Sequence, residues 1–150
     1  MPYDDLRKGR YSEQQRAYFI TTVLDERERR YFADYFCGRC VVHEMRSLHD
    51  EGKVCSLAWV IMPDHVHWLF QLGDEMDLSS VIKHFKARSA HRVNDYLHRH
   101  GTLWQKSFHD HAVRKDEDVQ GIARYIVANP LRAGLVKHIG DYPLWDAIWL

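Results

Sequence analysis

Two histidines separated by one residue are the clearest candidates for a metal site in this sequence. His65 and His67 begin a segment rich in aliphatic and aromatic residues, which predicts a β-strand. Residues two apart on a strand project from the same face, so the two imidazoles would lie side by side. Neutral imidazole is the commonest metal ligand among side chains, and the pair therefore predicts a chelate.

Other histidines compete for this role, because the chain contains eleven of them. His98 and His100 have the same spacing but fall in a predicted helix, where residues two apart do not face each other. His109 and His111 fall in a predicted strand and remain competitors. An alternative is therefore a zinc site of four histidines: His65, His67, His109 and His111.

Tyr125 and Asn129 form a second candidate pair near the end of the chain. They are four residues apart in a predicted helix, so they would lie on one face. An amide oxygen can act as a third ligand to a hard cation such as Mg²⁺ or Mn²⁺. A tyrosine hydroxyl beside that cation could attack phosphorus. The alternative is that Tyr125 is an ordinary aromatic residue that packs at the edge of the core.

The elements that must position these residues follow from hydrophobic periodicity and turn signals. In chain order the pattern predicts a strand at 16–24, a helix at 28–50, and two strands at 54–62 and 65–72 joined by Pro63-Asp64. A helix that Asp77 caps follows at 77–100, then a strand at 108–114 and a short helix at 116–129. The order β-α-β-β-α-β predicts an α+β, ferredoxin-like split βαβ fold. We expect a four-stranded antiparallel sheet with two helices on one face, plus a C-terminal helix that carries Tyr125. The last twenty residues are expected to pack back on the body.

Composition fits one domain spanning residues 1–150. Hydrophobic residues make up 45% and charged residues 28% of the chain, which is typical of a globular protein. No apolar run is long enough for a membrane helix, and the N-terminus lacks the apolar region of a signal peptide, so we expect a cytoplasmic protein. The three cysteines are expected to be free thiols, including the pair Cys37 and Cys40.

The net charge is zero, but the charges are unevenly distributed along the chain. Residues 81–115 contain eight Lys and Arg against two Asp, and a second basic cluster lies near the N-terminus. Phosphate contacts require such local clusters, although a solvated helix face would look the same. The candidate DNA-binding residues are Arg7, Lys8, Arg10, Lys83, Lys86, Arg88, Arg92 and Arg114.

Four segments together resemble the REP-associated tyrosine transposases of the HUH superfamily. Residues 62–67 are similar to the family's M-P-x-H-x-H strand, residues 104–114 to its W-Q-x-x-F-x-x-H-x-x-R segment, and residues 125–136 to its Y-I-x-x-N-P-x-R-A-G-L-V helix and exit. Residues 3–10 and the strand at 18–23 resemble its start. Residues 11–16 and the C-terminal tail match less well, which leaves the choice of DNA sequence open.

The resemblance implies roles for individual residues. It assigns His65 and His67 as metal ligands, Asn129 as the amide ligand and Tyr125 as the nucleophile. It implies cleavage of single-stranded DNA beside a palindromic hairpin, with a 5′-phosphotyrosine intermediate and a free 3′-OH. His109 and His111 would then orient DNA or support the site.

The sequence therefore favours a metal-dependent single-stranded DNA endonuclease and strand transferase that uses Mg²⁺ or Mn²⁺. Its partner would be hairpin DNA, and it could act as a monomer or a homodimer. One alternative is a non-catalytic regulatory protein that binds DNA hairpins on the same fold. The other is the small zinc hydrolase with four histidine ligands.

Overall fold

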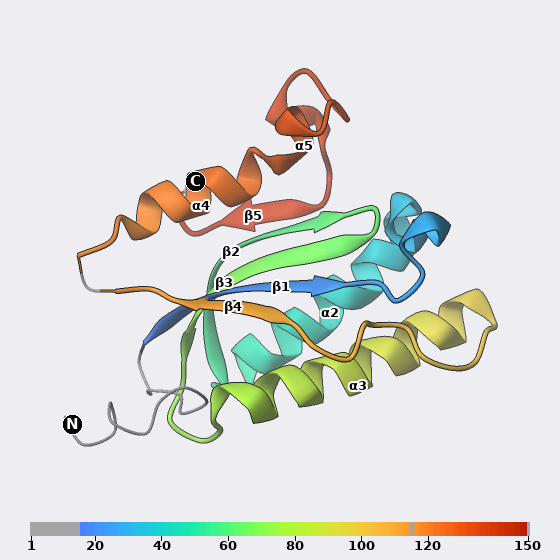
Figure 1. Ribbon diagram of the computed structural model, residues 1–150, viewed down its shortest axis with the longest axis horizontal. Coiled ribbons are helices and arrows are strands. Elements are labelled where there is room, and N and C mark those ends of the chain that lie inside the picture. The colour runs from blue at the N-terminus through green and yellow to red at the C-terminus, as the bar shows by residue number, and fades with distance from the viewer. Residues whose placement is uncertain (1–15, 115, 150) are drawn as a thin grey trace.

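The computed structural model describes residues 16–114 and 116–149. Its centre is an antiparallel sheet of five strands in the order β4-β1-β3-β2-β5 (Figure 1). The strands are β1 (Ala17–Val23), β2 (Val54–Met62), β3 (His65–Leu72), β4 (His109–Ala112) and β5 (Trp145–Ala147). The first four confirm the predicted sheet, and β5 is an additional strand at one edge.

The central hairpin of β2 and β3 forms where the sequence predicts it. Met62 pairs with His65, so Pro63 and Asp64 make a two-residue turn. The turn is also held from outside, because the Phe32 N–H donates to the Pro63 carbonyl at 3.1 Å and the Leu24 N–H donates to the Asp64 carbonyl at 2.9 Å. Its closure places the two histidines at the start of β3.

Helix α2 spans Tyr35–Asp50. The sequence predicts that it starts at Glu28, seven residues earlier, and this prediction is wrong. Arg30 has a left-handed φ of 48°, which interrupts the helical path. Asp34 then caps α2, because its carboxylate accepts hydrogen bonds from two backbone N–H groups of the first turn. Two 3-10 turns precede the cap: η1 (Arg27–Arg29) and η2 (Tyr31–Ala33).

Helix α3 (Leu78–Leu97) begins as predicted and ends slightly earlier than predicted. The Asp77 carboxylate accepts a hydrogen bond from the Ser80 N–H at 2.9 Å. At the other end His98 has a φ of 55°, and its N–H turns back to the Asn94 carbonyl. This left-handed cap stops the helix before His100, the expected end.

The C-terminal segment crosses to the other face of the sheet and then returns to its edge. It comprises α4 (Val119–Val127), α5 (Asn129–Arg132), η3 (Ile139–Asp141) and β5. The Tyr142 hydroxyl donates to the Ile61 carbonyl at 2.6 Å, and the Ile61 N–H donates to the Leu144 carbonyl at 3.0 Å. The tail thus packs back on the body, as predicted, and also extends the sheet.

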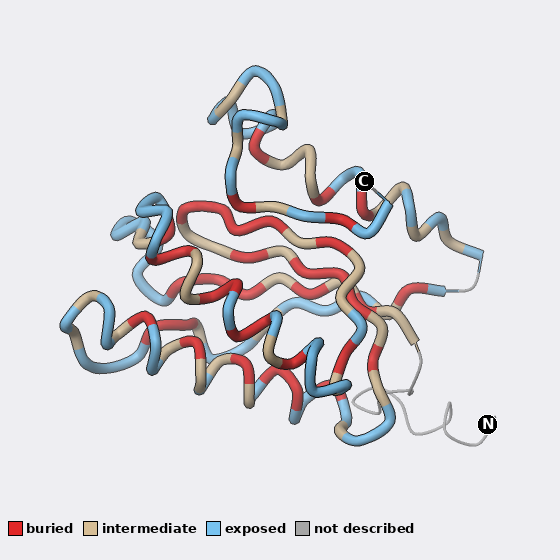
Figure 2. Tube along the Cα trace, turned by 180° about the vertical axis from the view of Figure 1, so that it is seen from behind, coloured by how far each residue is buried: buried red, intermediate tan, exposed pale blue. Residues whose placement is uncertain are grey.

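The elements form three layers. Helices α2 and α3 cover one face of the sheet and α4 covers the other (Figure 1). The first core cluster includes Trp68, Phe70 and Phe85, and the second includes Leu69 and Ile126. In Figure 2 the buried positions run along the central strands and the inner sides of the helices. Within the described residues, no helix is long and apolar enough to cross a bilayer.

Candidate active site

The two predicted metal ligands lie next to each other on β3. The ring centroids of His65 and His67 are 4.7 Å apart, with the rings at 77° to each other. Both side chains project from the face that α4 covers, because Leu69, two residues further along, belongs to the core cluster beneath α4. The strand therefore places the pair as the sequence predicts.

His65 is oriented by the acidic residue that precedes it. Its Nδ1 lies 2.7 Å from Asp64 Oδ1, and a carboxylate can only accept, so Nδ1 carries a proton and, in the neutral ring, Nε2 keeps the lone pair. Arg27 Nε donates to the other carboxylate oxygen at 2.8 Å. Partial burial works against ionisation of Asp64, but the hydrogen bonds from His65 and Arg27 hold its pKa below the ordinary value. This carboxylate–histidine arrangement is typical of metal-binding histidines.

His67 is partly buried, like His65, and is held by a hydroxyl. Its Nδ1 lies 2.8 Å from Thr21 Oγ1 on β1, and its ring contacts Phe19 edge-on at 5.5 Å between centroids. Burial lowers the pKa of His67 to about 3, with smaller electrostatic contributions from His65 and Arg132. His67 is therefore neutral at physiological pH, and its Nε2 can act as a ligand when Nδ1–H donates to Thr21.

Tyr125 lies on α4 over the same part of the sheet. Its side chain is 53% exposed, and its ring lies 6.4 Å from the ring of Phe19. Phe19 is thus in edge contact with the rings of both Tyr125 and His67. The fold brings a solvent-accessible phenol and the histidine pair to one face, although about sixty residues of sequence separate them.

Arg132 is a site residue that sequence reasoning missed. Its guanidinium lies 3.8 Å from the centroid of the Tyr125 ring, and its Nη2 donates to the Tyr125 carbonyl at 2.7 Å. A cation over an aromatic face is a favourable contact. Arg132 occurs in the conspicuous run that follows Tyr125, but only the turn between α4 and α5 shows that it folds back onto that ring.

Asn129 lies at the start of α5 rather than on the helix of Tyr125. Helix α4 ends at Val127, and Ala128 links the two helices. Asn129 is half-buried, and its backbone carbonyl accepts a hydrogen bond from the Ala133 N–H at 2.9 Å. The uninterrupted helical face expected for Tyr125 and Asn129 is therefore broken between them.

The donor set of the histidine pair fits a divalent cation. Both rings can present Nε2 while a neighbour holds Nδ1, and the burial of His67 keeps that ligand deprotonated. In residues 16–114 and 116–149 no three His, Cys, Asp or Glu side chains cluster to form a metal site. A third ligand from these residues would therefore be of another type, such as the Asn129 amide.

The two remaining histidine candidates do not join this pair. His111 Nε2 is taken up by the Glu117 carboxylate at 2.9 Å and 3.0 Å. His109 pairs with Thr21 on the other side of β1 from His67, so a full strand separates the two histidines. This arrangement does not support a zinc site of four histidines.

Three of the predicted DNA-binding residues have partners within the protein. Lys86 donates to the carbonyls of residues 105–107, and the ordinary pKa of its amine is lowered by burial. Arg92 Nε donates to buried Glu44 at 2.6 Å, and Arg88 Nε lies 2.9 Å from the other oxygen of Glu44 in an ion pair without hydrogen-bond alignment. These three side chains therefore stabilise the fold.

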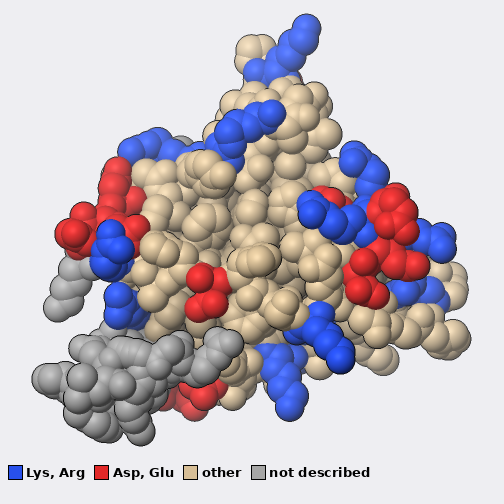
Figure 3. Space-filling view, viewed as in Figure 1, with Lys and Arg blue, Asp and Glu red and all other residues tan. Residues whose placement is uncertain are grey.

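The other predicted basic residues are more accessible. Lys83 is exposed on α3, and Arg114 is exposed and lies 3.4 Å from Asp116. On the face shown in Figure 3, Lys and Arg side chains lie around the rim and leave the centre largely uncharged. Arg7, Lys8 and Arg10 lie outside the described residues.

A hollow of about 430 Å³ lies beside the candidate nucleophile. It is lined by Phe19, Glu117, Asp118, Gly121, Ile122 and Tyr125. Apolar side chains, two carboxylates and the exposed phenol therefore surround an open space next to Tyr125.

Comparisons with known proteins show which family this chain belongs to. The IS200-like transposase family matches residues 13–129. A Haemophilus influenzae protein named for the REP-associated tyrosine transposases is 30% identical over 142 residues, which cover 84% of this chain and 76% of the relative. The REP-associated tyrosine transposase of Escherichia coli K12 is 34% identical over 88 residues, covering 57% of this chain and 50% of that protein.

Two solved structures share the fold. A REP-associated tyrosine transposase bound to a REP hairpin superposes with a TM-score of 0.75 at 24% identity, covering 93% of this chain and 81% of the other. A Deinococcus radiodurans R1 protein assigned to the transposases, solved at 1.90 Å, gives a TM-score of 0.57 at 20% identity and covers 82% and 96% of the two chains.

Proposed function

Because the chain belongs to the IS200-like transposase family, we propose that it cleaves single-stranded DNA beside a palindromic hairpin and can rejoin the ends. The observation that carries the proposal is that Tyr125, His65 and His67 share one face of the sheet. Tyr125 and His67 both contact Phe19 on that face, and His65 lies next to His67. A generic metal site would not need an exposed phenol at this position. The relative whose structure contains a REP hairpin supports hairpin DNA as the substrate class.

In the proposed reaction the Tyr125 oxygen attacks the scissile phosphorus. A bond from the phenolic oxygen to phosphorus forms as the bond to the 3′ oxygen breaks. The phenol loses its proton and the leaving oxygen takes one up, so the products are a 5′-phosphotyrosine and a free 3′-OH. The phosphodiester energy is retained in the covalent link, and the 3′-OH can reverse the step.

Residues around the phenol would hold it for this attack. Arg132 fixes the ring through its stacked guanidinium and its hydrogen bond to the Tyr125 carbonyl. His65, His67 and Asn129 would hold Mg²⁺ or Mn²⁺, which when bound supplies positive charge at the phosphate. Such a protein would act in the cytoplasm, as a monomer or a homodimer.

The metal role can be tested by changing His65. We expect His65→Ala to abolish cleavage of a labelled hairpin oligonucleotide at modest Mg²⁺ or Mn²⁺ while hairpin affinity is kept. Exposed His43 supplies the matched control, since His43→Ala removes a histidine outside the site. Cleavage by His65→Ala at the wild-type rate, or by the wild type in a chelator, would refute the role of the metal.

A further inference from the structure

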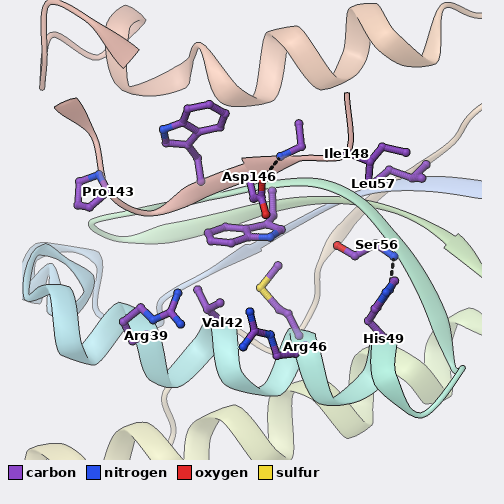
Figure 4. Close-up of a pocket in the computed structure, with 13 residues that line it drawn as sticks. Arg39, Val42, Arg46, His49, Ser56, Leu57, Pro143, Asp146 and Ile148 are labelled. Carbon is purple, nitrogen blue, oxygen red and sulfur yellow. Dashed lines mark hydrogen bonds between the residues drawn. The ribbon is translucent and has the colours of Figure 1, made fainter. Parts of the chain in front are cut away.

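A groove on the other side of β5 has no place in the chemistry described above. It has a volume of about 310 Å³ and runs between α2 and the edge of the sheet formed by β2 and β5 (Figure 4). Helix α4, which carries Tyr125, lies on the opposite face of the sheet (Figure 1). The groove is therefore separate from the candidate active site.

One wall of the groove presents unpaired positive charge. Arg39 and Arg46 both line it from α2, and neither side chain makes a hydrogen bond or an ion pair with any residue that the structure describes. They are two helical turns apart on one face, about 10 Å along the axis. By contrast, Arg88 and Arg92 on α3 both form ion pairs with Glu44.

A histidine extends this wall. His49 Nδ1 accepts a hydrogen bond from the Ser56 N–H at 3.0 Å, so the neutral ring carries its proton on Nε2. In Figure 4 its ring lies next to the Ser56 backbone at one end of the groove. His49 thus adds a fixed N–H donor to the two guanidinium groups.

The floor of the groove is apolar and includes an indole. Val42, Met45 and Trp59 line it, and Trp59 Nε1–H has no partner among the residues that can be described. The single acid of the lining is Asp146, whose Oδ1 already accepts from the Ala147 N–H at 2.8 Å. The groove therefore combines donors for anions with a surface on which a flat ring can lie.

We propose that this groove binds a single-stranded DNA segment that flanks the cleaved hairpin. Arg39 and Arg46 contact backbone phosphates of the strand. Trp59 offers its ring and its N–H to a base, as aromatic residues do in proteins that bind single strands. The proposal rests on DNA being the substrate, and it adds a contact on the opposite face from Tyr125.

The test measures binding without cleavage. Tyr125→Phe protein, without divalent metal, is titrated with a labelled hairpin that carries single-stranded oligothymidine extensions and with the same hairpin alone. Arg39→Gln/Arg46→Gln is compared with Arg29→Gln/Lys106→Gln, which removes the same charge from exposed positions outside the groove. Circular dichroism checks that all variants are folded.

We expect the groove variant to bind the extended hairpin roughly tenfold more weakly, about 1.4 kcal/mol. The plot of log K against log salt concentration should become less steep, its slope decreasing in magnitude by about 1.4, because two single-strand phosphate contacts are lost. Affinity for the bare hairpin should stay unchanged. Because no cleavage is measured, failure of the proposed chemistry would not affect this result.

Three outcomes would overturn the proposal. One is a groove variant that matches the control in affinity and slope. Another is an equal loss on the bare hairpin, which would place the arginines on the stem. The third is competition by thymidine monophosphate as effective as that by the oligothymidine, which would make the groove a mononucleotide site.

Discussion

His65 and His67 have the same side chain but different surroundings. The Asp64 carboxylate fixes the first ring, and the Thr21 hydroxyl and burial fix the second. The sequence could predict that both lie on one face, because strand alternation alone determines it. It could not predict the partners, because Thr21 comes from a strand more than forty residues away.

Burial of His67 predicts an acid-sensitive fold. Its pKa is lowered from 6.5 to about 3 in the folded protein, so neutral His67 contributes stability that is fully present above pH 6.5 and is lost as pH falls towards 3. Each pH unit in this window should remove up to about 1.4 kcal/mol from the free energy of unfolding of the metal-free protein. Urea denaturation from pH 6.5 downwards measures this loss.

The control separates His67 from the general effect of acid. His67→Gln should show a shallower decline with falling pH, whereas His43→Gln, which changes an exposed histidine, should follow the wild type. Equal slopes for all three proteins would contradict the account of His67.

Arg132 is predicted to position Tyr125. Arg132→Gln removes the stacked guanidinium and the hydrogen bond to the Tyr125 carbonyl, so the rate of covalent attack at saturating DNA should fall about tenfold. Affinity for the hairpin should change little. Arg132→Lys should recover part of the rate, because it keeps the charge but loses the planar fork.

Single-turnover kinetics distinguish these effects. A loss confined to DNA affinity, with the rate at saturation unchanged, would mean that Arg132 binds DNA and does not hold the phenol.

At the scale of elements, the sequence predicts the helices and strands that have a strong hydrophobic periodicity. It misses the boundaries and strands that depend on contacts with distant residues. The central hairpin and α3 have clear patterns and form as predicted, except that α3 ends slightly early. The start of α2 was wrongly predicted at Glu28 because aromatic residues recur at helical spacing before Asp34. In the structure the left-handed backbone of Arg30 interrupts the helical path, and Asp34 caps the helix. β5 has three residues, too few to show alternation, and depends on its pairing with β2.

Because the Tyr142 hydroxyl helps to hold β5 on the sheet, Tyr142→Phe should lower the stability of the protein measurably. Burial raises the pKa of Tyr142 to about 12, so its hydroxyl remains a donor to the Ile61 carbonyl at physiological pH. Removing this hydroxyl should lower the free energy of unfolding by about 1–2 kcal/mol. Tyr35→Phe changes an exposed tyrosine on α2 and should have no measurable effect in the same denaturation experiment.

At the scale of the whole molecule, topology assembles the site from distant parts of the chain. The sheet order places β1 between β3 and β4, and the C-terminal segment carries Tyr125 over the face with His65 and His67. The resemblance of separate motifs indicated this assembly, whereas periodicity alone could not. The density of basic residues along the sequence was less informative, because α3 turns several of them towards Glu44 and the backbone.

The most direct test of the account is covalent capture of DNA by Tyr125. Labelled single-stranded hairpin DNA is incubated with the protein and Mg²⁺ or Mn²⁺, and the products are separated under denaturing conditions. The wild type should form a protein–DNA adduct and release a fragment with a free 3′-OH, while Tyr125→Phe binds the hairpin and forms no adduct. An adduct of normal yield with Tyr125→Phe would contradict the account, as would wild-type cleavage without any covalent intermediate.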